Sequence, residues 1–269
     1  MTKAHARPVI PSPDLKPIDR LVELMRILRS PDGCPWDREQ TLDSLKQTLV
    51  EEVYEVIDAI EHGEPAMLEE ELGDLLLQVV FQSQICAEEG QFSFDDVVRQ
   101  LNEKLVRRHE HVFGERRASS AAEALKSWNR VKATEKEGAE ASVVEGMPKH
   151  LPALYKAQKL QKKVARVGFD WDLIEDVLAK IEEELGELKE AIREDHAGKI
   201  RDEIGDLLFS VVNVSRFLGH QSEEALNGTI DKFSDRFRKL EQQLRQDGKD
   251  IEACSLEEMD EVWKQVKTR

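Results

Sequence analysis

The sequence predicts an all-α fold made of two tandem copies of one helical domain, and three observations lead to this prediction. No stretch shows the alternation of apolar and polar residues that is typical of β-strands. Apolar residues instead recur three and four positions apart, as they do along one face of a helix. The third observation is a run that occurs twice: LVEEVYEVIDAI and EELGDLLLQVV begin at Leu49 and Glu70, and KIEEELGELKEAI and DEIGDLLFSVV begin at Lys180 and Asp202. This self-similarity indicates an internal duplication.

The first copy follows a proline-rich stretch, residues 1–17, which we interpret as a disordered or extended tail. Residues 18–28 are predicted to form the first helix. The turn-rich segment SPDGCPWD, which starts at Ser30, is predicted to be a loop. Thr41 is the predicted N-cap of the first acidic helix, over residues 42–62.

A second acidic helix is predicted over residues 66–89, because His62-Gly63 ends the first one and Pro65 stands at a helix start. A third helix is expected over residues 94–111. A further short helix carries Trp128.

The polar segment over residues 136–150 is the predicted linker between an N-terminal domain, residues 18–135, and a C-terminal domain, residues 151–269. The second copy then repeats the pattern of the first. Its predicted helices span residues 152–166, 172–195, 197–219, 222–245 and 256–269.

Composition limits the classes of function. The chain has 269 residues, 35% of them charged, and a formal net charge of −16. Such an acidic chain is a poor binder of nucleic acid backbones and anionic membranes. It has no apolar run of the ~20 residues that span a membrane, its N-terminus lacks the apolar core of a signal peptide, and its three cysteines show no metal or redox spacing. We therefore expect a cytoplasmic protein.

The duplicated run places acids in a pattern that suits a metal ion. Each copy has two acids three residues apart, hence on one helical face, on each of two successive helices. These acids lie beside or within the apolar stripe, where carboxylates without a counter-charge repel one another. Mg²⁺ is the simplest remedy, with Mn²⁺ as a substitute, because both prefer oxygen ligands. The predicted ligands are Glu52, Glu55, Glu71 and Asp74 in the first copy and Glu184, Glu187, Glu203 and Asp206 in the second.

Basic and aromatic residues also recur in matching places. The basic pairs are either exposed residues without a role or contacts for a metal-bound phosphate. The tryptophans are either packing anchors or platforms on which a base stacks. In the first copy these residues are Lys104, Arg108, Trp128 and Lys132, and in the second they are Lys232, Arg236, Trp263 and Lys267.

The copies differ one turn before the second acidic pair. Lys180 precedes Glu184 by four residues, and the first copy has Thr48 in its place. The lysine side chain either reaches a phosphate or forms a helix pair with Glu184. We assign the main catalytic site to the second copy, and the first copy keeps a possible second metal site.

Together these motifs resemble the MazG family of nucleoside triphosphate pyrophosphohydrolases in its two-domain form. The matching motifs are GCPWD at Gly33, E-E-x-x-E at Glu51 and Glu183, E-x-x-D at Glu71 and Glu203, KLxRRHxHVF at Lys104, LPAL at Leu151 and VGFDW at Val167. The resemblance covers residues 18–269. It implies an all-α fold, a homodimer, Mg²⁺ dependence, and hydrolysis of a nucleoside triphosphate to a monophosphate and pyrophosphate.

The resemblance also implies roles for single residues. Glu184, Glu187, Glu203 and Asp206 would hold Mg²⁺, and Glu183 belongs to the same acidic motif and could orient the attacking water. Lys232 and Arg236 would contact phosphates, and Trp263 and Lys267 would help to hold the nucleotide.

Rival functions make different predictions. A di-iron bundle would require E-x-x-H pairs, which the sequence lacks. A non-catalytic acidic scaffold or regulator predicts that the paired acids are dispensable. A narrower pyrophosphohydrolase for one specialised nucleotide predicts a strict base preference, whereas stacking on a tryptophan favours broad specificity.

Overall fold

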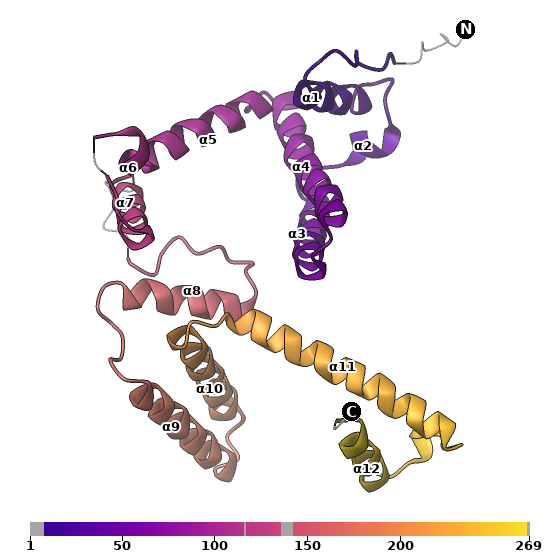
Figure 1. Ribbon diagram of the computed structural model, residues 1–269, viewed down its shortest axis with the longest axis vertical. Coiled ribbons are helices and arrows are strands. Elements are labelled where there is room, and N and C mark those ends of the chain that lie inside the picture. The colour runs from indigo at the N-terminus through magenta and orange to yellow at the C-terminus, as the bar shows by residue number, and fades with distance from the viewer. Residues whose placement is uncertain (1–7, 116, 136–141, 268–269) are drawn as a thin grey trace. The chain divides into compact units, whose positions relative to one another are not determined.

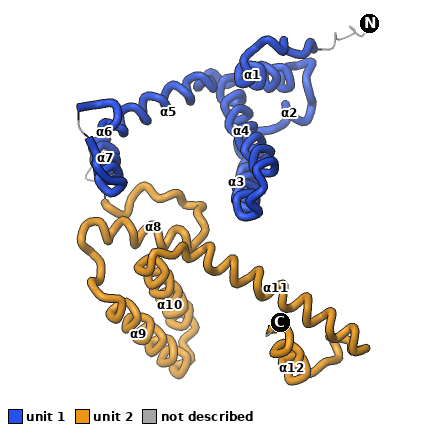
Figure 2. The backbone as a smooth tube through the Cα atoms, in the orientation of Figure 1, with its two compact units in different colours: residues 1–138 blue, residues 139–269 orange. Residues whose placement is uncertain are grey.

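The computed structural model describes residues 8–115, 117–135 and 142–267. Within these ranges the chain forms twelve α-helices and one 3₁₀ turn and contains no β-strand, so the all-α prediction is confirmed. Contacts divide the chain into two compact units, residues 1–138 and 139–269, which Figure 2 shows in blue and orange. No described helix is long and apolar enough to span a membrane.

The first unit is built on a helical hairpin. Gly63, at φ 73°, ends one arm of the hairpin in the left-handed conformation that glycine adopts without strain. A small core joins the hairpin to the first helix through Met25, Leu45, Val80, Phe81 and Ile85. In chain order the helices are α1 (Pro17–Leu28), α2 (Pro35–Glu39), α3 (Leu45–His62), α4 (Pro65–Glu88), α5 (Phe94–Arg108), α6 (Glu110–Phe113) and α7 (Ala121–Thr134), of which α3 and α4 form the hairpin (Figure 1).

The second unit has a matching hairpin, α9 with α10, which packs against α8. Helix α11 starts beside α8, and α12 folds back onto α11 (Figure 1). The core between α11 and α12 comprises Leu240, Leu244, Val262 and Val266. The elements are α8 (Ala153–Ala165), α9 (Ile174–Arg193), α10 (Ala197–Phe217), α11 (Ser222–Gln246), the 3₁₀ turn η1 (Ile251–Ala253) and α12 (Leu256–Lys267).

A buried glutamine fixes the start of α11 on α8. The Gln158 amide oxygen accepts hydrogen bonds from the Ser222 backbone N–H, at 2.9 Å, and from its hydroxyl, at 2.8 Å. The Gln158 amide nitrogen donates to the His220 carbonyl at 2.6 Å. Gln158 therefore satisfies the first N–H of α11, which the helix itself leaves without a partner, and binds the carbonyl two residues before it.

Three local predictions were wrong. The segment after Ser30 is not all loop, because Pro35 opens the short helix α2. Thr41 is not the N-cap of α3: the helix starts three residues later than predicted, because Thr41 and Ser44 hydrogen bond to each other in a preceding turn. The predicted helix over 94–111 is interrupted at His109, whose ψ of 41° leaves the helical region.

Residues 1–7 of the predicted tail and residues 136–141 of the predicted linker lie outside the described residues. Residues 8–16 of the tail and residues 142–150 of the linker carry no helix, and Pro17, the last residue of the predicted tail, opens α1. The remaining predicted helices agree with the structure to within three residues at each end.

Candidate active site

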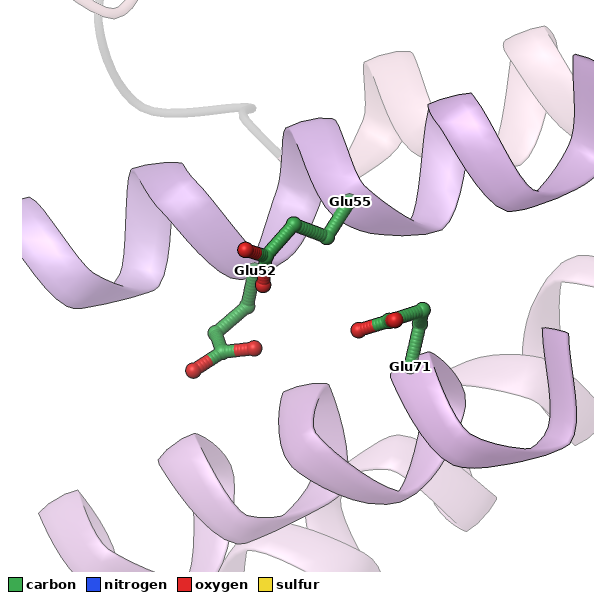
Figure 3. Close-up of side chains that lie close together, drawn as sticks. All are labelled: Glu52, Glu55 and Glu71. Carbon is green, nitrogen blue, oxygen red and sulfur yellow. The ribbon is translucent and has the colours of Figure 1, made fainter. Parts of the chain in front are cut away.

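The hairpin of the first unit brings three carboxylates together. Glu52 and Glu55 extend from α3 and Glu71 from the facing α4 (Figure 3). One oxygen of each lies within 4.8 Å of the others. The pKa of Glu52 is raised, first because burial disfavours its charged form and then because Asp74 and Glu55 repel it.

The hairpin of the second unit repeats this cluster. Glu184 and Glu187, from α9, and Glu203, from α10, also bring oxygens to within 4.8 Å of one another. Glu184 is buried, with 5% of its surface exposed. Burial, followed by repulsion from Glu184 and Glu203, raises the pKa of Glu187.

The donors of the second cluster fit a divalent cation. All three are carboxylates, the ligands that Mg²⁺ and Mn²⁺ prefer. Glu203 Oε2 is buried and has no hydrogen-bond partner among the described residues. A buried acceptor without a partner is costly, and a bound cation would satisfy it.

The fourth predicted ligand of each copy lies outside these groups of three. Asp74 is close enough to Glu52 to raise its pKa, and Asp206 lines a cavity together with Glu184. Each aspartate stands one turn after the glutamate of its own helix and has a shorter side chain. It therefore reaches less far between the helices than a glutamate would.

Lys180 is the cation of the second cluster in this structure. Its ammonium nitrogen lies 2.7 Å from a carboxylate oxygen of Glu183 and 2.7 Å from one of Glu184. These hydrogen bonds, the one with Glu183 first, raise the pKa of Lys180. Of the two alternatives for this lysine, the structure shows the pair within the helix. Thr48 offers no such charge in the first unit.

The recurring basic and aromatic residues of the second unit are not gathered around the carboxylates. Lys232 and Arg236 lie on α11, and neither forms an ion pair within residues 142–267. Trp263 packs on α11, with the centre of its ring 5.1 Å from the centre of the Phe233 ring. Lys267 is the last residue of the same helix, α12.

In the first unit the arginine equivalent to Arg236 is Arg108, and it is held in an ion pair with Glu135. Arg108 Nε donates to Glu135 at 3.0 Å, and Arg107 Nε donates to the same carboxylate at 2.7 Å. The Arg108 guanidinium also lies 5.3 Å from the centre of the Trp128 ring. Hydrogen bonds from Arg108 and then Arg107 lower the pKa of Glu135 to about 2.

A cavity of about 420 Å³ adjoins the second cluster. Its wall is mostly apolar and includes Phe169, Trp171 and Phe209, and one side reaches Glu184 and Asp206.

Two buried amides, Gln161 and Asn213, also line the cavity. Sequence reasoning missed both. The available signal was Asn213, which stands where the first copy of the duplicated run has Phe81.

Comparisons with known proteins identify relatives of this chain. A family model described as the MazG nucleotide pyrophosphohydrolase domain matches residues 40–113 and 174–240, one segment in each unit. The chain is 47% identical over 249 residues to a nucleoside triphosphate pyrophosphohydrolase/pyrophosphatase MazG of Thermotoga maritima, covering 93% of this chain and 95% of that protein. It is 44% identical over 255 residues to a nucleoside triphosphate pyrophosphohydrolase of Escherichia coli strain K12, covering 93% and 97%.

Among solved structures, a MazG-related protein from Thermotoga maritima is 29% identical and covers 43% of this chain and 98% of its own. The TM-score of that match is 0.37, which is too low to compare the two arrangements.

Proposed function

Since the chain belongs to the MazG family of nucleotide pyrophosphohydrolases, we propose that it hydrolyses nucleoside triphosphates at the acidic cluster of its second unit. The products are a nucleoside monophosphate and pyrophosphate. The cluster of Glu184, Glu187 and Glu203, with its unpartnered buried oxygen, is the observation that supports this location.

The metal ion we propose is Mg²⁺, with Mn²⁺ as a substitute, held by the three clustered glutamates and Asp206. When bound, it would neutralise phosphate charge and polarise the anhydride that breaks. Glu184 is the most buried of the four, so it depends most on a neighbouring cation.

The reaction adds water to the α-phosphorus and breaks the bond from that phosphorus to the oxygen bridging to the β-phosphorus. Pyrophosphate leaves with the electron pair of the broken bond. We assign Glu183 to orienting the water and accepting its proton, because it belongs to the acidic motif but lies outside the group of three. Lys180 forms ion pairs with Glu183 and Glu184 in this structure. A bound metal ion would replace it beside Glu184, and Lys180 would then contact a phosphate.

We propose that Lys232, Arg236, Trp263 and Lys267 act across a homodimer. They lie on α11 and α12, and the contacts of α12 run to α11. The hairpin of α9 and α10 also leaves apolar side chains exposed. A second copy of the chain would cover this surface. The exposed residues include Leu185, Ile192, Ile204, Leu208 and Val211.

The location of the label from ¹⁸O-water tests the proposed reaction. Purified protein with Mg²⁺ and each of eight common nucleoside triphosphates should release monophosphate and pyrophosphate in equal amounts, with ¹⁸O in the monophosphate. Label in pyrophosphate would place the attack on the β-phosphorus. Free phosphate with diphosphate would refute the proposed point of cleavage.

Mixing two inactive variants tests the dimer. Glu187→Ala removes a carboxylate and Arg236→Ala removes a cation. If the cation acts across the dimer, each mixed dimer regains one intact site of its two, whereas residues acting within one chain restore none. Light scattering gives the oligomeric state independently.

The acidic cluster of the first unit supports a second metal site, because it repeats the same geometry. Its equivalent of Arg236 is held by Glu135, and Phe81 replaces Asn213. These differences favour the second unit as the main site of hydrolysis.

A further inference from the structure

The cavity of the second unit has the composition of a site for a flat, partly polar ring. Phe169, Trp171 and Phe209 contribute aromatic surface to it, and all three side chains are substantially exposed. An aromatic ligand stacked on them would remove this surface from water. A volume of about 420 Å³ lies within the range of small-molecule pockets.

One wall of the cavity carries a hydrogen-bond acceptor without a partner. Gln161 is 5% exposed, and its Nε2 donates to the Phe209 carbonyl at 2.8 Å. Because a carbonyl only accepts, this contact fixes which end of the amide is nitrogen. The other end, Oε1, is buried and has no partner among the described residues.

A second amide supplies the complementary donor. Asn213 Oδ1 accepts a hydrogen bond from Arg216 Nε at 2.8 Å, and Arg216 is in turn held by an ion pair with Asp170. A guanidinium only donates, so Asn213 Nδ2 is the remaining group of that amide. Within the part of the chain that the structure describes, Nδ2 has no hydrogen-bond partner. The two amides that line the cavity thus keep one acceptor and one donor without a partner.

The first unit fills the equivalent place. Phe81 stands at the position of Asn213 in the duplicated run and is 4% exposed in the core. The guanidinium of Arg29 lies 5.4 Å from the centre of its ring. The duplication therefore shows that this fold packs well with an apolar side chain there, and the polar lining of the second unit needs another explanation.

We propose that the cavity binds the nucleobase of the substrate, with Gln161 Oε1 accepting from the base and Asn213 Nδ2 donating to it. This proposal rests on the proposed function, because the cavity reaches Lys180, Glu184 and Asp206. A nucleotide with its base in the cavity would have its phosphates beside the carboxylates. Each common base presents a donor next to an acceptor on its pairing edge, so this amide pair recognises a base without selecting one.

Purine riboside triphosphate, which differs from ATP only in lacking the 6-amino group, tests the role of Gln161. For the unmodified protein we expect kcat/KM to be about tenfold higher for ATP, or about 1.4 kcal/mol. Gln161→Met keeps the length of the side chain and removes the acceptor. In this variant the ratio should fall to about one. Lys162→Met, an exposed neighbour on α8, is the matched control and should keep the ratio.

Ribose 5-triphosphate, which has no base, tests the cavity as a whole. Asn213→Phe copies the first unit into the second and should lower kcat/KM for ATP by roughly ten- to a hundredfold. Hydrolysis of ribose 5-triphosphate should not change. Equal losses for both substrates, in this variant and in Gln161→Met, would overturn the proposal.

Calorimetric binding of AMP separates this proposal from the proposed function, because it requires no turnover. Weaker AMP binding by Gln161→Met, with unchanged binding of ribose 5-phosphate, supports the base site even if ATP is not hydrolysed. ATP hydrolysis with identical AMP binding by both proteins would refute the base site and leave the proposed function intact.

Discussion

Replacing Lys180 with methionine should destabilise the metal-free protein but not the protein loaded with Mg²⁺. The lysine contacts Glu183 and Glu184, each at 2.7 Å, and the side chain of Glu184 is only 7% exposed. Without a metal ion, Lys180 is the cation that compensates this buried carboxylate. A bound divalent cation would take over that role.

The expected loss follows from the two contacts. A hydrogen bond to a charged group contributes about 1.5–3 kcal/mol when it is buried, and an exposed ion pair contributes about 0–1 kcal/mol. The Lys180 side chain is 35% exposed, so solvent screening favours the lower values. We expect a loss of about 1–2 kcal/mol in the metal-free protein. By thermodynamic linkage, Mg²⁺ should bind the variant about five- to thirtyfold more tightly.

Urea unfolding in EDTA and in excess Mg²⁺ measures both effects, and calorimetry gives the Mg²⁺ affinity. Lys249→Met is the control, because Lys249 forms an exposed pair with Glu258 at 2.7 Å. Its small effect should be the same in both media. If Lys180→Met loses the same stability with and without Mg²⁺, and binds Mg²⁺ no more tightly, the lysine does not stand in for the metal ion.

Three further predictions follow from the structure. Glu187→Ala should abolish most hydrolysis, measured as pyrophosphate release, and Glu55→Ala should not; the reverse would move the catalytic site to the first unit. Gln158→Leu should lower the free energy of unfolding by about 2–4 kcal/mol, because the buried backbone N–H and hydroxyl of Ser222 lose their acceptor; a loss below about 0.5 kcal/mol in urea unfolding would contradict this. The lowered pKa of Glu135 stabilises the folded state above its ordinary pKa of 4.5, and that contribution is lost as pH falls through about 2; the difference in urea midpoint between the protein and Glu135→Gln should therefore shrink across this range, and a constant difference would argue against the ion pairs.

The features that depend on regular helical spacing could be predicted from sequence alone. The acidic hairpins follow from acidic and apolar residues three and four positions apart. Such residues share one helical face whatever the helix packs against. Gly63 marked a helix end because glycine adopts the left-handed conformation without strain, and Pro65 marked a helix start because its ring fixes φ. The same local rules failed at Thr41, because its hydroxyl accepts from the Ser44 backbone N–H in a turn that precedes the helix.

The cavity could not be predicted, because no local rule connects its parts. Gln161 lies on α8, Phe169 in the following loop and Asn213 on α10. They meet only through the packing of α8 against the hairpin. The hydrogen bonds that leave Gln161 Oε1 free also depend on that packing. Spacing along a helix also does not include side-chain length, so the sequence could not show which three of the four predicted ligands in each cluster bring oxygens to within 4.8 Å of one another.

The contrast between Phe81 and Asn213 has a consequence for how the chain melts. A filled core gains contacts that an open cavity lacks, and cavities cost stability in proportion to their volume. The second unit should therefore unfold at a lower temperature than the first. The first unit should then unfold in a separate transition. A ligand in the cavity would raise only the lower transition, until the two merge into one. The duplication would thus have given one unit whose thermal stability is fixed and a second unit whose thermal stability depends on the concentration of its ligand.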